Sequence, residues 1–159
     1  MRRRRTKDLA LMRPAKPTDR ATVYEDHCIA ALRTAGFRIT MPRVQVIRAL
    51  ANATVALSAY AIHEKIVESG GKIDVVSVYR ILETLQEVGL IHHVGIADGY
   101  VPAHQDTSSE GDASQLVLVE GTGEVREQKM SAEILGILEE QVRELGLEPL
   151  RIKIEILAK

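Results

Sequence analysis

The sequence has little of the residue types that often organise small proteins, with one cysteine, one phenylalanine and no tryptophan among 159 residues. Because Cys28 is the only cysteine, the chain can form neither an intrachain disulfide nor a cysteine-rich zinc site. No apolar run approaches the roughly 20 residues that cross a bilayer, and the arginine-rich start lacks the apolar segment of a secretory signal. We therefore expect a cytoplasmic protein with no membrane partner, an aliphatic core, and Cys28 as a buried apolar residue.

The net charge of −1 conceals a gradient along the chain. Residues 1–20 carry eight Lys and Arg against two Asp, which is a net charge of +6. Residues 21–101 are nearly neutral at −1, and residues 102–159 carry −6. This gradient predicts different tasks for the two ends, with any contact to a polyanion confined to the first part of the chain.

Residues 1–17 show no apolar periodicity and contain two prolines and four consecutive arginines. Such a composition predicts a flexible basic arm. Two interpretations of the arm stay open. It binds a polyanion, or it is a solubilising tail without a target.

Helical periodicity follows the arm, because apolar residues recur there at intervals of three and four. The predicted helices cover residues 19–35, 41–50, 59–69 and 75–88. Good N-cap residues precede the later three, namely Thr40, Ser58 and either Asp74 or Ser77. Three short helices joined by tight turns, the last of them strongly amphipathic, predict a helix-turn-helix.

The periodicity changes after Gly89. Residues 90–94 and a segment from Tyr100 onward are strand-like and flank the turn residues 97–99, which predicts a β-hairpin. A hairpin directly after a helix-turn-helix is the arrangement of a winged helix. We therefore assign residues 18–103 to a winged helix-turn-helix domain and the polar residues 104–114 to a hinge loop.

Residues 115–159 have the pattern of a smaller second domain, with predicted strands at 116–119, 124–127 and 150–157 and a helix after Ser131. The last strand alternates apolar and charged residues, which predicts one buried face and one face in water. A unit of about 45 residues is marginal alone, so we infer that it buries its apolar surface against a second copy. The expected fold class is α/β (α+β), an N-terminal winged helix-turn-helix followed by a small α/β dimerisation domain.

Four motifs in order then carry a family resemblance. They are residues 36–43 (GFRITMPR), residues 57–59 (LSA), residues 76–80 (VSVYR) and residues 88–91 (VGLI). Over about residues 20–159 the chain resembles the ferric uptake regulator family of metal-dependent DNA-binding repressors. The resemblance implies a DNA-binding winged helix and a dimerisation domain.

The chain departs from this family where the resemblance implies metal ligands. Val119 and Thr122 occupy the two cysteine positions of the family's Cys-x-x-Cys-Gly motif, and Ala56 occupies a usual histidine position. We therefore expect no structural zinc and no metal switch. Two alternatives stay open, a divalent metal at Asp98, where the family often has a carboxylate, and a rewired site near His104. The further ligands of that rewired site would be Asp106, Glu110 and Asp112.

DNA recognition is expected from the helix at 75–88, because a helix fits the major groove and its N-terminal end meets the bases. The arginines of the arm are expected to enter a minor groove. For each contact the alternative is ordinary packing, a structural ion pair or simple exposure. The expected DNA-contacting residues are Arg2, Arg3, Arg4, Arg5, Arg43, Lys72, Ser77, Tyr79 and Arg80.

These features together predict a sequence-specific transcription regulator, most simply a repressor, that binds a palindromic double-stranded DNA operator as a homodimer. Two alternatives stay open, a metal-responsive regulator with rewired ligands and a protein-interaction module that no longer reads DNA. An enzyme is not expected, because the chain has no nucleophile elbow and no phosphate loop. A His-Glu-x-x-His pattern that starts at His63 is incomplete, with Val67 in the second histidine position.

Overall fold

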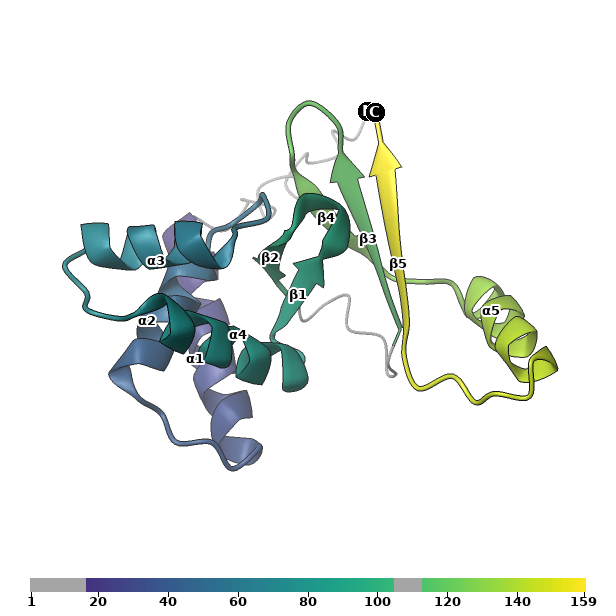
Figure 1. Cartoon of the computed structure of the whole chain (residues 1–159), viewed down its shortest axis with the longest axis horizontal. Helices are drawn as coiled ribbons and strands as arrows, with labels where there is room; N and C mark the ends of the chain where they lie inside the picture. Colours follow the sequence, from purple (N-terminus) through teal and green to yellow (C-terminus); the bar gives the residue numbers. More distant parts are fainter. Residues whose placement is uncertain (1–16, 105–112) are drawn as a thin grey trace, which may run out of the picture.

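The structure is a computed structural model that describes residues 17–104 and 113–159. Helices α1 to α4 lie together at one side, the β1–β2 hairpin and a second sheet follow, and α5 lies beyond that sheet (Figure 1). Within these residues no helix is both long and apolar enough to cross a membrane. The elements are α1 (Pro17–Thr34), α2 (Met41–Leu50), α3 (Ala59–Glu68), α4 (Val75–Glu87), β1 (Ile91–Val94), η1 (Gly95–Ala97), β2 (Gly99–Pro102), β3 (Ala113–Val119), β4 (Val125–Gln128), α5 (Ala132–Glu144) and β5 (Ile152–Ala158).

The helices begin close to the predicted positions, but one predicted cap is not made. The Ser58 side chain accepts a hydrogen bond from the Ala61 N–H at 3.1 Å, and Asp74 rather than Ser77 caps α4. Thr40 has the extended backbone of an N-cap, yet its side chain accepts no capping hydrogen bond. Pro42 explains part of this difference, because a proline in the first turn has no N–H to offer to a cap.

The core of the helical unit is aliphatic, as the composition predicts. Tyr24 of α1 crosses it and donates its hydroxyl to the Leu90 carbonyl at 2.8 Å, and burial raises the pKa of Tyr24. Cys28 is fully buried, and burial raises the pKa of its thiol to about 11, so it packs as an apolar group. The largest fully buried aliphatic side chains of this core are Leu32, Ile47, Leu50, Ile62, Ile66, Leu82, Leu85 and Ile91.

The strands form two sheets. β1 and β2 pair antiparallel, and the second sheet has the order β4-β3-β5, with β3 antiparallel to β4 and parallel to β5. The hairpin connection differs from the predicted turn at 97–99. It consists of η1 and Asp98, whose φ of 47° is left-handed, and Gly99 already belongs to β2. Contacts from β5, described below, hold η1 in this conformation, and such distant contacts leave no local signal in the sequence.

β5 corrects a second prediction. Its alternating pattern predicted a buried apolar face and a charged face in water. Instead Lys153 and Glu155 on the charged face bond to the β1–β2 hairpin, whereas Ile156 on the apolar face is 38% exposed. Alternation defines the two faces of a strand, but the packing of the β1–β2 hairpin against the second sheet decides what each face of β5 contacts.

Candidate nucleic-acid interface and its hinge

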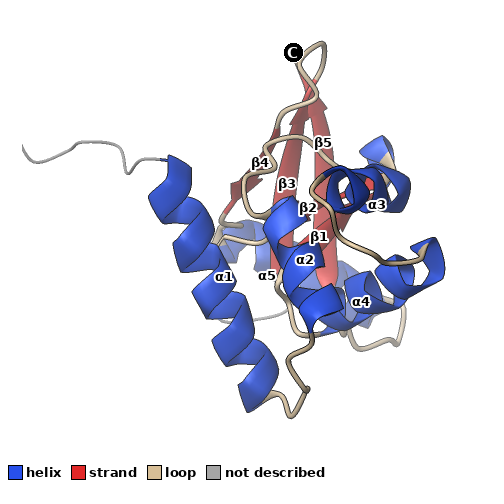
Figure 2. Cartoon of the chain, turned by 90° about the vertical axis from the view of Figure 1, so that its left-hand side faces the viewer, coloured by secondary structure: helices blue, strands red, loops and turns tan. Residues whose placement is uncertain are grey.

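α4, the predicted recognition helix, has a buried face and an exposed face. Val78, Leu82 and Leu85 are fully buried against the helical core, whereas Tyr79 and Arg80 are exposed. Figure 2 shows α3 and α4 next to each other in front of the sheets. The helix therefore presents the two predicted contact residues to solvent, as major-groove binding requires.

Tyr79 has an aromatic neighbour on α3. The ring of Tyr60 lies 6.5 Å from the ring of Tyr79 in an edge-to-face arrangement, and Tyr60 is 63% exposed. Such a pair contributes about 0.5–1.5 kcal/mol beyond its buried area and orients both rings. Sequence reasoning missed Tyr60. The available signal was a large aromatic side chain on the polar side of an amphipathic helix, in a chain with four tyrosines.

Arg80 directly follows Tyr79 in α4, and Lys72 lies in the turn before α4. Both side chains are exposed, and within the described ranges neither makes an ion pair or a hydrogen bond. The described residues therefore supply no partner for a structural ion pair of Arg80. Glu83 and Glu87 follow on the exposed side of α4. The part of α4 suited to a polyanion is thus its N-terminal half.

The N-terminus of α4 is already capped by a carboxylate. Asp74 accepts the Ser77 hydroxyl at 2.7 Å and the Ser77 N–H at 2.8 Å, and these two hydrogen bonds lower the pKa of Asp74. The charge of Asp74 compensates the positive end of the helix dipole, which disfavours a phosphate at this end of α4. The Ser77 hydroxyl retains acceptor capacity, which suits an amino group of a base.

Arg43 contacts the turn before α2. Its guanidinium lies 5.4 Å from the centroid of the Phe37 ring and donates to the Arg38 carbonyl. These contacts stabilise residues 36–40 and leave other guanidinium donors for a phosphate. The arginines of the arm, Arg2 to Arg5, lie outside the described residues.

Residues 54–57, between α2 and α3, connect the helical unit with both sheets. Leu57 exchanges two backbone hydrogen bonds with Tyr100 of β2, at 2.8 and 2.9 Å. The Thr54 carbonyl accepts the N–H of Val125 in β4 at 2.8 Å. An apolar cluster lies beneath this segment, with Val94, Val101 and Leu116 buried and Ala56 and Val125 packed against them. In the residues described, the helical unit and the two sheets therefore meet in a packed junction.

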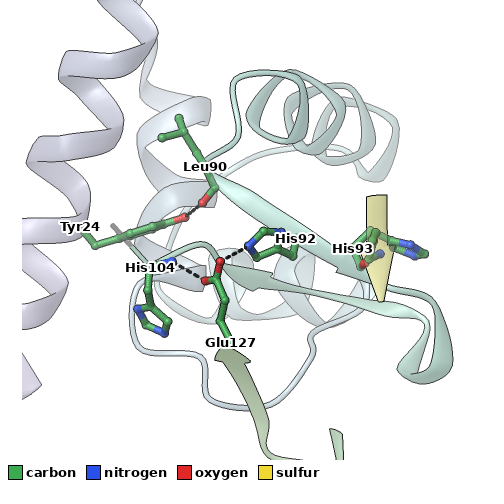
Figure 3. A network of polar contacts seen from close by, with 7 residues as sticks. Tyr24, Leu90, His92, His93, His104 and Glu127 are labelled. Carbon is green, nitrogen blue, oxygen red and sulfur yellow. Dashed lines mark hydrogen bonds and ion pairs between the residues drawn. The ribbon is translucent and has the colours of Figure 1, made fainter. Parts of the chain in front are cut away.

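Glu127 of β4 lies between the hairpin and the second sheet at this junction (Figure 3). One of its carboxylate oxygens lies 2.8 Å from His92 Nε2, and the other accepts the His104 N–H at 2.8 Å. The neighbouring His93 points to the other side of β1, as strand alternation requires. Because His92 belongs to β1 and His104 follows β2, one buried carboxylate holds both strands of the hairpin to the second sheet.

Glu155 of β5 holds the other end of the hairpin. Its carboxylate accepts the N–H groups of Gly95 and Ile96, each at 2.9 Å, and pairs with Lys153 Nζ at 2.6 Å. Burial alone would raise the pKa of Glu155. The bonds from Lys153 and the two backbone N–H groups outweigh burial and lower the pKa to about 2. Lys153 also donates to the His93 carbonyl, so η1 and β1 are both fixed to β5.

The positions where the resemblance implies metal ligands do not fit a metal. Ala56 is part of the apolar cluster, and a β-carbon added to Gly99 would lie 3.0 Å from the Ala56 β-carbon. Asp98 lies 3.7 Å from His93 Nε2, a pair that supplies two donors. Within residues 17–104 and 113–159, no three His, Cys, Asp or Glu side chains are grouped closely enough to hold a metal ion. Three residues of the rewired alternative lie outside these ranges: Asp106, Glu110 and Asp112.

The second unit exposes apolar surface on α5 and β5. No residue of α5 is buried, and Ile137 is 55% exposed. Leu157 of β5 is exposed as well, and Figure 1 shows α5 standing away from the helical unit. Exposed apolar side chains of this kind are typical of a protein–protein interface.

Comparisons with known proteins agree with this architecture. A model of the ferric uptake regulator family matches residues 34–157. A ferric uptake regulation protein of Pseudomonas aeruginosa is 34% identical over 118 residues, which cover 74% of this chain and 85% of the relative. A zinc uptake regulator complexed with zinc and DNA has the same fold, with a TM-score of 0.77, 22% identity and coverage of 86% of this chain and 90% of that one. The manganese-containing ferric uptake regulator of P. aeruginosa gives a TM-score of 0.52 at 29% identity, covering 82% of this chain and 96% of that one.

Proposed function

Because this chain belongs to the ferric uptake regulator family, whose members are DNA-binding transcription regulators rather than enzymes, we propose that it is a repressor that binds a palindromic operator as a homodimer. We also propose that this binding needs no divalent metal and takes place in the cytoplasm. In this proposal residues 18–103 bind DNA, residues 104–114 form the hinge and residues 115–159 dimerise. Residues 1–17 are a basic arm that adds electrostatic affinity.

The observation that carries the proposal is the exposed group formed by Tyr60, Tyr79 and Arg80 on α3 and α4. Arginine pairs with guanine or phosphate, and tyrosine rings offer both an apolar face and a hydroxyl to the major groove. Lys72 lies before the start of α4 and Arg43 lies in the first turn of α2, and in this proposal both contact the DNA backbone. Ser77 completes the set at the N-terminal end of α4.

Homodimerisation supports the same function. Two copies related by a twofold axis present two α4 helices, which suits half-sites about 34–36 Å apart on one face of the duplex. The exposed apolar residues of α5 and β5 supply the surface that a second copy would cover. The related zinc uptake regulator, which shares the fold, was solved with DNA.

The contacts between the β1–β2 hairpin and the second sheet support metal independence. A metal ion that joined the hairpin to the second sheet would fix the orientation of the recognition helix. In this chain Glu127 and Glu155 already join them through hydrogen bonds to His92, His104, Gly95 and Ile96. Ala56, Val119 and Thr122 offer neither an imidazole nor a thiolate at the family's ligand positions.

The test is selection of bound fragments from a random duplex pool, run in parallel with a chelator and with added zinc, iron(II) or manganese. We expect the same palindromic consensus from the selection with chelator and from the selection with metal. Enrichment of DNA fragments only in the presence of metal would replace the metal-independent proposal with the rewired site near His104. No enrichment in either selection would contradict DNA recognition and favour the protein-interaction module.

Arg80→Ala tests the recognition surface itself. We expect at least about a tenfold loss of affinity for the selected operator, because a base or phosphate contact of arginine is lost. Arg33→Ala is the matched control, since Arg33 is an exposed arginine on α1. Fluorescence anisotropy at fixed salt measures both variants, and equal affinity of the two would exclude Arg80 from the interface.

A further inference from the structure

Val76 is an exposed apolar residue at the start of α4. It is 60% exposed and lies one turn before Tyr79 and Arg80, so all three share one face of the helix. Valine is β-branched and therefore a poor choice for an exposed helical position on propensity alone. In the described part of the chain, Val76 is thus an apolar side chain without a structural task.

The position of Val76 on α4 decides what it can meet. Glu83 and Glu87 make the C-terminal half of the exposed face acidic, so the approach to DNA is confined to the first turns. At that end Asp74 keeps its negative charge and occupies the Ser77 N–H and hydroxyl. A phosphate is therefore disfavoured beside Val76, and the remaining neighbour in the major groove is the edge of a base.

Thymine is the base whose major-groove edge carries a methyl group, and apolar side chains recognise it by contact with that methyl. We propose that Val76 is a specificity-determining residue that packs against a thymine methyl in each half-site of the operator. This inference rests on the proposed function. It assigns to Val76 a base preference that is separate from the contacts of Tyr79 and Arg80.

The experiment uses the full chain and the operator obtained by selection. Each thymine is replaced in turn by uracil, which lacks the methyl group, and the dissociation constant is measured for wild type and Val76→Ala. We expect uracil at one thymine position of each half-site to weaken wild-type binding by about fourfold, the value of roughly one buried methyl group. Val76→Ala binds the unmodified operator about fourfold more weakly per half-site and no longer distinguishes thymine from uracil at that position.

Val23→Ala is the matched control, because Val23 is 61% exposed on α1. This variant keeps the wild-type response to uracil at every position. If Val76→Ala still binds more weakly when uracil replaces the other thymines, the variant is folded and bound in register. Equal sensitivity of wild type and Val76→Ala at every thymine would overturn the assignment of Val76 alone, whereas failure to select any operator would overturn the proposed function with it.

Discussion

Two glutamates determine how the helical unit is attached to the second unit. Glu127 accepts hydrogen bonds from groups on both strands of the hairpin, and Glu155 binds the N–H groups of its turn. Each carboxylate is largely buried, so it depends on its partners for the hydrogen bonds that water would otherwise supply. Replacing one partner leaves the other unsatisfied, which costs more than the hydrogen bond itself contributes.

The lowered pKa of Glu155 predicts a specific dependence of stability on pH. The pKa of about 2 lies below the ordinary value of 4.5, so the stabilisation is fully present above pH 4.5 and is lost as the pH falls toward 2. Urea unfolding of wild type and Glu155→Gln should therefore differ at pH 6 and converge below pH 4.5. Glu144→Gln, on the exposed surface of α5, is the control and should show no such convergence. A difference between wild type and Glu155→Gln that stays constant with pH would contradict the attachment through a charged carboxylate.

At the scale of the helices, similar N-cap sequences give different contacts. Ser58 accepts a hydrogen bond from Ala61, whereas Thr40 makes none before a helix with Pro42 in its first turn. The sequence identifies both starts, because each residue type is a good cap. It does not identify which cap is made, because that depends on the donors available in the first turn.

These two caps give a prediction for helix stability. Ser58→Ala should lower the free energy of unfolding by about 1 kcal/mol, because it removes the hydrogen bond to the Ala61 N–H. Thr40→Ala should lower it by less than half as much, because no capping hydrogen bond is lost. Equilibrium urea unfolding followed by circular dichroism measures both values. Equal losses would show that the side-chain hydrogen bond is not what stabilises α3.

At the scale of the whole molecule, the second unit is incomplete as a single copy. α5 buries none of its residues, and the apolar face of β5 is partly exposed. A small sheet with an uncovered apolar face is marginal in water. The homodimer expected for this family supplies the missing cover, and it places two recognition helices on one operator.

Disruption of this surface should separate the copies. Ile137→Glu places a charge on exposed α5 surface, so we expect sedimentation to shift from twice the mass of the chain to the mass of one chain. Operator affinity should fall with it, because one half-site supplies only half of the contacts. Val23→Glu introduces the same charge on α1 and should remain dimeric. A dimeric Ile137→Glu protein would exclude this face of α5 from the interface.

Much of this protein was determined by its sequence alone. Apolar periodicity identified the four helices, the hairpin and the elements of the second unit, because burial of one face imposes a period on the chain. The motif around Tyr79 and Arg80 predicted which helix is the recognition helix, and both residues are exposed on α4. These properties are local, so the sequence records them directly.

The tertiary structure decided how these pieces meet. The pairing of Tyr60 with Tyr79 joins residues on two helices, and the attachment of Gly95 and Ile96 to Glu155 joins residues about 60 positions apart. The sequence pattern of β5 placed its charged residues in water, because alternation cannot show that the β1–β2 hairpin contacts that face. Long-range hydrogen bonds and packing depend on the whole fold, and for that reason the junction between the hairpin and the second sheet became visible only in three dimensions.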